Sequence, residues 1–348
     1  MKRASGCLFG LAFGDALGAP TEFLSVPEIL ARFPPDGPRD LPRDVLGVTR
    51  VTDDTQMALA VGEALREIEE ERAPFTPERL ERALRRTLVA WLRSPDNDRA
   101  PGMTCLRACE HLARGVPWRR ATVEGSKGCG ANMRVAPVGL LPAGKIGAER
   151  GGAADEARAA IAQFQAALTH GHPTALAASD LTARAVAALA SGTPPERLAG
   201  ELRAYAEDQR LVYHERYLGT LWEQPGVESP QAFIARGWDE CLGVLDRLDR
   251  ALAHPDRAGD PCLATGDGWV AEEALATGLL CFLLFPDDPR AALGRAAVTR
   301  GDSDSIACLA GAFVGAYAGM DAWPEEWAVA IEYRDRLAAL GTSWDGPA

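Results

Sequence analysis

Apolar residues recur every three to four positions along most of the chain, which is the spacing of one face of an α-helix. The segments with this pattern are residues 6–19, 55–68, 77–92, 105–113, 154–168, 173–190, 195–206, 231–252, 270–284, 291–298, 306–317 and 325–340. Strict alternation of apolar and polar residues, which is typical of strands, is almost absent. The pattern therefore predicts an all-α protein.

Short clusters of Pro, Gly and Asp separate the predicted helices, for example at residues 33–44 and 253–261. None of them is a long Gly/Ser linker, and no repeat of fixed period indicates a solenoid. The chain has 348 residues, 47% of them apolar, which is enough to bury a large core. We expect a single compact multi-helical domain over residues 1–348.

Two predicted helices carry glycine at every fourth position. The glycines are Gly6, Gly10, Gly14 and Gly18 in one helix and Gly311, Gly315 and Gly319 in the other. Glycine inside a helix costs roughly 1 kcal/mol relative to alanine, so the stripes need a packing reason. A glycine stripe lets another backbone approach closely. Close packing of these two helices would bring residues 15–22 near residues 302–305.

Charge and cysteine content narrow the classes of function. Lys and Arg number 37 against 49 Asp and Glu, a net charge of −12 that repels nucleic-acid backbones and anionic membranes. The most apolar run, residues 274–285, is too short to cross a membrane, and Asp15 interrupts the apolar N-terminal run that imitates a signal peptide. The eight cysteines form no CxxC pair. We expect a cytoplasmic protein with reduced thiols and neither general nucleic-acid binding nor membrane association.

Two acidic clusters each precede an apolar helical segment. The first reads "TDDT" at residues 52–55 and the second "DSDS" at residues 302–305. Helix capping is one explanation, because Asp, Ser and Thr oxygens accept hydrogen bonds from the first turn and the helix dipole favours negative charge there. One cap oxygen suffices, however, so the second carboxylate of each cluster is surplus.

A metal site is the other explanation for the paired clusters. Clusters that face each other would repel unless protons or cations intervened. Carboxylate and hydroxyl oxygens are ligands suited to Mg²⁺, Mn²⁺ or Ca²⁺, and four carboxylates suggest two bridged ions. Glu22 follows Pro20 in a predicted loop, where its side chain is either an ordinary solvated glutamate or a third acidic element of the site.

Five ordered motifs then match a known family. They read "GCLFGLAFGDALGAPTEF", "TDDTQMALA", "GCGANMRVAPVGLL", "LTHGHPTALAAS" and "GDSDSIACLAGAFVGAYAG" and extend from residue 6 to residue 319. The chain resembles the ADP-ribosylglycohydrolase family, which includes the dinitrogenase reductase-activating glycohydrolase. The resemblance implies a compact all-helical domain with two divalent cations, Mg²⁺ or Mn²⁺, that removes ADP-ribose from a modified acceptor.

The resemblance also implies roles for particular residues. It places the metal ligands at Thr52, Asp53, Asp54, Asp302, Asp304 and Ser305. Ser305 stands where many members have Thr, and both residues offer a hydroxyl. Glu22 falls at the acidic position implicated in catalysis, and we expect Glu22 and Asp304 to handle the protons of the reaction.

A Gly-rich loop is the expected substrate-binding segment. "EGSKGCGANMR", residues 124–134, offers glycine N–H groups and two cations, Lys127 and Arg134, to a pyrophosphate. Taken alone, such a loop is better explained as a flexible connection or the start of a helix. The resemblance implies that ADP-ribose contacts Gly125, Ser126, Lys127, Gly128 and Asn132, with His170 near the substrate. Cys129 and Asn132 depart from the commoner family pattern, which bears on acceptor preference.

We therefore expect a monomeric hydrolase whose partners are ADP-ribosylated proteins, arginine-linked ones above others, or small-molecule conjugates. A binuclear-metal nucleotide phosphohydrolase is an alternative, because two bridged ions also suit attack at phosphorus. A catalytically silent protein that binds ADP-ribose or metal is the other alternative. Product analysis separates the three, since only the first releases free ADP-ribose.

Overall fold

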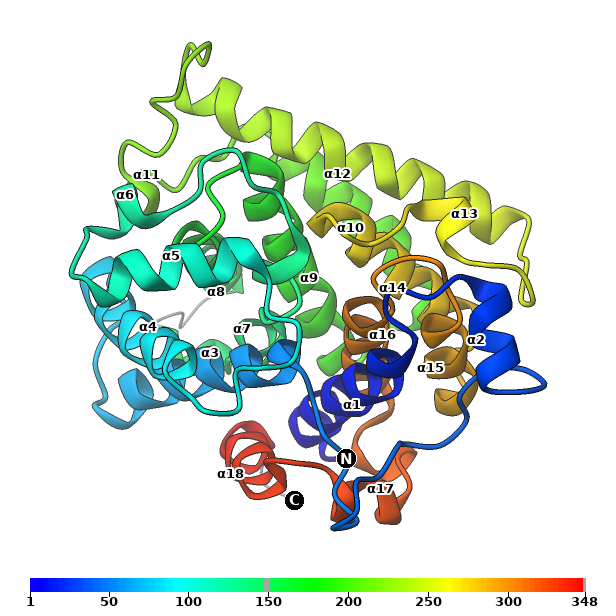
Figure 1. Ribbon diagram of the computed structural model, residues 1–348. Coiled ribbons are helices and arrows are strands. Elements are labelled where there is room, and N and C mark those ends of the chain that lie inside the picture. Colours follow the sequence, from blue (N-terminus) through cyan, green and yellow to red (C-terminus); the bar gives the residue numbers. More distant parts are fainter. Residues whose placement is uncertain (147–150, 347–348) are drawn as a thin grey trace.

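The chain is all-α in a computed structural model that describes residues 1–146 and 151–346. In these described ranges no strand occurs, and the isolated β-bridges join Thr49 to Ile331, Val123 to His170 and Gly128 to Val270. The helices pack into one compact multi-helical domain, as predicted (Figure 1). Residues 147–150 and 347–348 of the expected domain lie outside the described part of the chain.

Most of the predicted helices are present with ends close to the predicted ones. The longer helices are α1 (Arg3–Gly18), α3 (Asp53–Glu70), α4 (Pro77–Leu92), α5 (Met103–Ala113), α8 (Gly151–Ala167), α9 (Pro173–Ala190), α10 (Pro195–Gln209), α12 (Pro230–Ala253), α14 (Ala271–Leu284), α15 (Pro289–Ala297), α16 (Ser303–Ala318) and α18 (Arg334–Trp344). The shorter ones are α2 (Val26–Arg32), α6 (Trp118–Ala121), α7 (Ala136–Leu140), α11 (Glu215–Leu218), α13 (Cys262–Thr265) and α17 (Glu325–Ala330), with 3₁₀ turns η1 (Ala19–Thr21), η2 (Cys129–Ala131), η3 (Ala143–Lys145) and η4 (Met320–Ala322). Of the shorter helices, only α17 lies in a segment with the predicted pattern, because one or two turns are too few for an apolar period to show.

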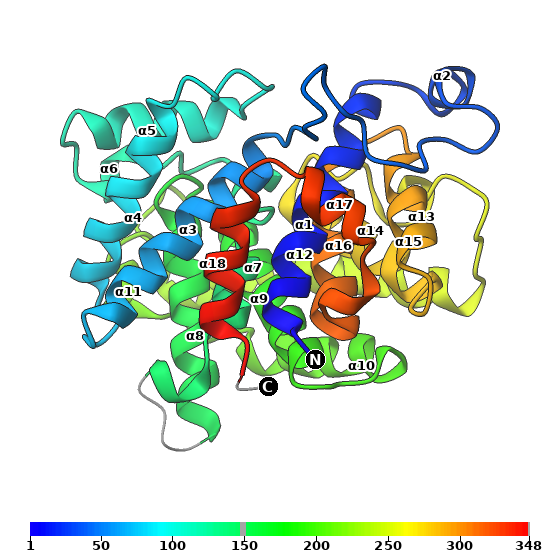
Figure 2. The same ribbon diagram turned by 90° about the horizontal axis from the view of Figure 1, so that it is seen from below.

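The two glycine-striped helices, α1 and α16, pack against each other at the centre of the molecule (Figures 1 and 2). A Cβ atom on Gly14 would lie 1.9 Å from the carbonyl oxygen of Ala307, and one on Gly311 would lie 1.9 Å from that of Gly10. Only glycine permits such an approach of two backbones. The expected packing reason for the stripes is thus confirmed.

The predicted single helix over residues 325–340 is wrong. Residues 331–333 separate α17 from α18, and Tyr333 adopts a left-handed conformation with φ 56°. The backbone of this break pairs with Thr49, whose N–H donates to Ala330 at 2.8 Å and whose carbonyl accepts from Glu332 at 2.9 Å. Tertiary hydrogen bonds that fix the segment before the first acidic cluster therefore override the helical period.

The two ends of the described chain meet beside α1. The Asp345 carboxylate accepts hydrogen bonds from the N–H of Ala4 at 2.8 Å and from the hydroxyl of Ser5 at 2.5 Å. α18 lies alongside α1 (Figure 2), and a Cβ on Gly341 would lie 2.6 Å from the Cα of Ser5. The C-terminal helix is thus an integral part of the fold.

The remaining long helices surround the central pair. α3 packs on α4, α8 on α9, and α12 packs on α9 and α14 along the top of the molecule in Figure 1. In the described ranges no helix combines the length and the apolar character that crossing a membrane requires.

Candidate active site

The first acidic cluster lies at the N-terminus of α3 and is held by Asp15 of α1. Asp15 is fully buried, and its carboxylate accepts hydrogen bonds from the N–H groups of Thr52 at 3.0 Å and Thr55 at 3.1 Å. The Thr52 hydroxyl accepts from the N–H of Asp54 at 3.3 Å. Because Asp15 and Thr52 cap α3, the carboxylates of Asp53 and Asp54 are not needed as caps.

The second acidic cluster lies at the N-terminus of α16. Asp302 occupies the N-cap position, yet its side chain makes no capping hydrogen bond. One of its carboxylate oxygens instead accepts a hydrogen bond from the Cys129 thiol at 2.9 Å. Asp304 accepts from the N–H of Ser305 at 2.9 Å. The capping explanation therefore leaves Asp302 unexplained.

Both clusters face one cavity of about 340 Å³. The residues that line it are Glu22, Phe23, Asp53, Asp54, Ala100, Pro101, Gly102, Met103, Thr104, Cys105, Gly128, Cys129, Gly130, Met133, His170, Trp269, Asp302, Asp304 and Ser305. Within the described ranges, Glu22, Asp302 and Asp304 each offer a carboxylate oxygen within 4.8 Å of the other two. The packing of α1 on α16 thus brings together acidic groups that lie far apart in the sequence.

The carboxyl groups of the cluster hold their protons unusually firmly. Burial, followed by the charge of Asp304, raises the pKa of Asp15 to about 7, of Asp53 to about 8 and of Glu22 to about 9. The same two causes raise the pKa of Asp54 well above its ordinary value. Like charges in a buried site oppose ionisation, so the group is stable only when protons or cations compensate it.

The side chains present fit a divalent-cation site. One carboxylate oxygen of Asp54 is buried and has no hydrogen-bond partner. A buried, unpartnered carboxylate oxygen is costly unless it binds a cation or a proton. The donors are carboxylates with the Ser305 hydroxyl among them, which is the set that Mg²⁺ and Mn²⁺ prefer. The Thr52 hydroxyl is not part of the lining, although it lies one residue from Asp53.

The Gly-rich loop reaches the cavity with only part of its length. Gly128 lines the cavity, and so does His170, which follows α8. Gly125 and Ser126 lie outside the lining, and the Ser126 hydroxyl is 2.9 Å from that of Thr104 at the start of α5. The loop therefore presents its second half to the cavity.

Lys127 and Asn132 do not line the cavity, and their side chains anchor the loop. The Lys127 ammonium pairs with Glu240 of α12 at 2.6 Å and with Glu272 of α14. Asn132 is fully buried and donates to the carbonyl of Ala271 at 3.0 Å. Neither residue is part of the cavity lining, and both side chains hold the loop against other parts of the protein.

Several residues of the site carried no signal that the sequence alone would reveal. Asp15 was visible only as a charge in an apolar run. Phe23 and Trp269, at the rim of the cavity, are 69% and 41% exposed and stack with ring centroids 5.5 Å apart. The chain between α4 and α5 also lines the cavity, and the Gly102 N–H donates to Asp53 at 3.3 Å. These contacts depend on packing, not on a motif.

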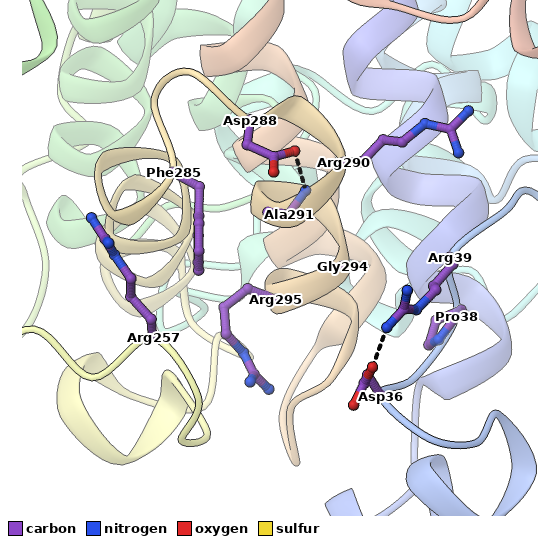
Figure 3. A pocket seen from close by; sticks show the side chains of 10 residues that line it. All are labelled: Asp36, Pro38, Arg39, Arg257, Phe285, Asp288, Arg290, Ala291, Gly294 and Arg295. Atoms are coloured by element: carbon purple, nitrogen blue, oxygen red, sulfur yellow. Dashed lines mark hydrogen bonds and ion pairs between the residues drawn. The ribbon is translucent and has the colours of Figure 1, made fainter.

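A second pocket of about 460 Å³ lies beside α15 and is lined by the side chains of Figure 3, which include four arginines. Arg39 pairs with Asp36, while Arg290 pairs with Asp40 at 3.1 Å. Arg295 is bound to backbone carbonyls. These guanidinium groups are largely engaged, and the pocket holds no cluster of potential nucleophiles or bases, so we place the chemistry at the acidic cavity.

The fold and the site define the class: this is an all-helical protein in which two acidic helix N-termini meet at one cavity. Sequence comparison gives its family. Residues 1–344 match the ADP-ribosylglycohydrolase family. The chain belongs to this family and is therefore a hydrolase of glycosyl bonds.

Two relatives and one solved structure illustrate the similarity. An ADP-ribosyl-[dinitrogen reductase] glycohydrolase of Rhodospirillum rubrum is 30% identical over 62% of this chain and 68% of its own length. The ADP-ribosylhydrolase ARH3 of Homo sapiens is 26% identical over 99% of this chain and 93% of its own. The solved structure of an ADP-ribosylglycohydrolase-related protein complex shares the fold, with a TM-score of 0.63 and 24% identity over 99% of this chain and 96% of that one.

Proposed function

We propose that this protein removes ADP-ribose from an ADP-ribosylated acceptor by cleaving the ribosyl glycosidic bond, with arginine-linked protein as the favoured substrate and small-molecule conjugates as further ones. The observation that carries the proposal is the convergence of Glu22, Asp302 and Asp304 on one cavity in a member of this family. We further propose that residues 1–348 form one domain that acts as a cytoplasmic monomer.

Two divalent cations, Mg²⁺ or Mn²⁺, are the cofactors of this proposal. Asp53 and Asp54 of α3, with Thr52 before them, would hold the ions from one side, and Asp302, Asp304 and Ser305 would hold them from the other. When bound, such ions lower the pKa of a coordinated water and orient the hydroxyl groups of a substrate. They would also compensate the buried carboxylates, including the unpartnered oxygen of Asp54.

The carboxylates themselves suit the charge that develops during the reaction. Breaking a ribosyl bond builds positive charge on the sugar ring, which nearby carboxylates stabilise. Glu22 follows α1 and the turn η1, lines the same cavity as His170, and has a carboxylate oxygen within 4.8 Å of those of Asp302 and Asp304. We assign Glu22 and Asp304 to the proton transfers: one takes a proton from the attacking water and the other gives a proton to the leaving group.

We assign substrate binding to the Gly-rich loop and to His170. Direct contacts with the ligand are assigned to Gly128 and His170, because both line the cavity. Gly125, Ser126, Lys127 and Asn132 would act by holding the loop in place, since the side chains of the last three contact other parts of the protein.

The test is product analysis on a panel of ADP-ribosylated arginine, serine, nucleic-acid-end and small-molecule conjugates, with Mg²⁺, Mn²⁺ or chelator. We expect metal-dependent release of free ADP-ribose, with Asp304→Asn at least about 100-fold slower while still folded. Asp335→Asn, at a 90% exposed side chain, is the matched control and keeps full activity. Release of phosphate or AMP would instead indicate the phosphohydrolase, and tight ADP-ribose binding without turnover would indicate a silent binding protein.

A further inference from the structure

Arg134 is a buried cation that pairs with no carboxylate in the described part of the chain. Its side chain is fully buried, and its guanidinium donates to the side-chain oxygen and the carbonyl of Gln165, both at 2.9 Å, and to the carbonyl of Gly130 at 3.2 Å. It also donates to the Thr169 hydroxyl at 2.9 Å. Burying a guanidinium costs free energy of desolvation, so the burial of Arg134 needs a structural or functional reason.

The Thr169 hydroxyl relays this contact to His170. Its oxygen lies 2.8 Å from the Nδ1 atom of His170 and 3.4 Å from the carbonyl oxygen of Ala166. That carbonyl already accepts the N–H groups of Thr169 at 3.0 Å and His170 at 2.8 Å. A carbonyl has two lone pairs, and 3.4 Å is long for an O–H···O bond. The Thr169 proton is therefore best accommodated on His170 Nδ1.

The donor and acceptor roles in this series of hydrogen bonds follow from the chemistry of arginine. A guanidinium only donates, so the Thr169 oxygen accepts from Arg134 and its single proton remains available for His170. An imidazole nitrogen that accepts a hydrogen bond carries no proton, and in the neutral ring the other nitrogen then carries it. We propose that Arg134 and Thr169 are positioning residues that hold His170 as the Nε2–H tautomer, so that it presents a neutral hydrogen-bond donor to the cavity.

The surroundings of His170 agree with a donor that faces a ligand. A Cβ on Gly128 or on Gly130 would lie 3.5 Å from Nε2, so glycine at both positions leaves this nitrogen uncovered. Burial, with the charge of Arg134, lowers the pKa of His170 to about 3, and the ring is therefore neutral at physiological pH. Its partner must be an acceptor oxygen. If the proposed function holds, that oxygen belongs to the diphosphate or a ribose hydroxyl of ADP-ribose.

The decisive measurement is the tautomer of His170 in the folded protein. Protein labelled with ¹⁵N-histidine is compared with a His170→Asn variant, which identifies the His170 signals because they are missing. We expect the proton on Nε2 and none on Nδ1. A proton on Nδ1, or on both nitrogens, at neutral pH would overturn the proposal. This readout needs no turnover, so it stands apart from the failure or success of the proposed hydrolysis.

Binding of ADP-ribose then tests the role of Thr169. Thr169→Val removes the hydroxyl with little change of shape, and the dissociation constant for ADP-ribose, measured by calorimetry, should rise roughly fivefold to tenfold, as expected for one lost hydrogen bond. Thr169→Ser keeps the hydroxyl and should bind as the wild type does, with the same ¹⁵N spectrum. An unchanged ¹⁵N spectrum and unchanged affinity in Thr169→Val would contradict the proposal. If this variant does not fold, the spectra of the wild type and of Thr169→Ser still determine the tautomer of His170.

Discussion

Asp54 shows how one side chain reports on the proposed ions. It is buried among like charges, and one of its oxygens has no hydrogen-bond partner. In chelator, Asp54→Asn removes one repelling carboxylate and should raise the melting temperature by roughly 2 °C. With Mg²⁺ or Mn²⁺ the wild type should gain stability and the variant should gain much less, because it has lost a ligand. Equal metal-dependent shifts in differential scanning fluorimetry would contradict Asp54 as a ligand.

Asp180 of α9 is a buried acid outside the site, and its effect depends on pH. Burial raises its pKa to about 6, although hydrogen bonds from Gln163 and Tyr205 oppose the shift. Between about pH 4 and pH 6 the unfolded chain loses this proton first, so the folded state binds more protons and stability falls as pH rises. The ionised Asp180 lowers the free energy of unfolding by about 3 kcal/mol above pH 6, and this effect vanishes near pH 4.

Asp180→Asn should remove this cost. The introduced amide can still accept from Tyr205, and it can donate to the oxygen of Gln163, which is buried without a partner. We expect the free energy of unfolding to rise at pH 7.5 by up to about 3 kcal/mol, with little change at pH 4. Urea denaturation at the two pH values measures this, and a gain of equal size at both would show that titration is not the cause.

At the scale of elements, the α1–α16 contact positions both acidic clusters. Gly14→Ala would drive a Cβ to within 1.9 Å of the Ala307 carbonyl oxygen, so the helices must separate. We expect a loss on the order of 3 kcal/mol in the free energy of unfolding, together with weaker metal binding, because the start of α16 moves away from Asp53 and Asp54.

The matched control for that prediction is Gly200→Ala in α10, where an added Cβ meets nothing within 4 Å. Alanine favours the helix there, so this variant should be more stable by about 0.5–1 kcal/mol. If both alanine variants change stability alike, helix propensity and not interhelical packing explains the glycine stripe.

Long helices were predictable because their apolar faces repeat over several turns, as in α4 and α9, whose ends match the prediction at both termini. The break between α17 and α18 was not, because its cause is a distant partner. Glu332 in this break binds Arg50 at 2.7 Å and also pairs with Arg99. No window of neighbouring residues contains that information.

At the scale of the whole molecule, Asp345 closes the fold by tying the C-terminal helix to the start of α1. Asp345→Ala leaves the N–H groups of Ala4 and Ser5 without this acceptor and should lower the melting temperature by roughly 2–4 °C. The rate per folded molecule should not change, because Asp15 and Gly18 lie at the opposite end of α1. Asp335→Ala, at an exposed residue of α18, serves as the control, and a drop in rate for Asp345→Ala alone would link the termini to the site.

The candidate site was predictable to the extent that motifs mark it. The two acidic clusters stand out in the sequence because one cap does not need two carboxylates. Glu22 stands out because it falls within the first family motif. Lys127 was expected at the ligand because of its charge, but the structure pairs it with Glu240 and Glu272. A side chain's direction depends on which neighbours the fold supplies, and the sequence does not name them.

The sequence by itself determined the helical class, most helix ends, the glycine stripes and the family resemblance. Each of these depends on the spacing of neighbouring residues or on short ordered motifs. Only the tertiary structure decided that residues 53–54 share one cavity with Asp302, Asp304 and Ser305. It also decided that Asp15 caps α3 and that Arg134 reaches His170 through Thr169. The physical reason is that hydrogen bonds and charge interactions act over a few ångströms of space. Their partners can be far apart in the chain, by 285 positions in the bond from Ser303 to Gly18 and by 341 in the bond from Ala4 to Asp345.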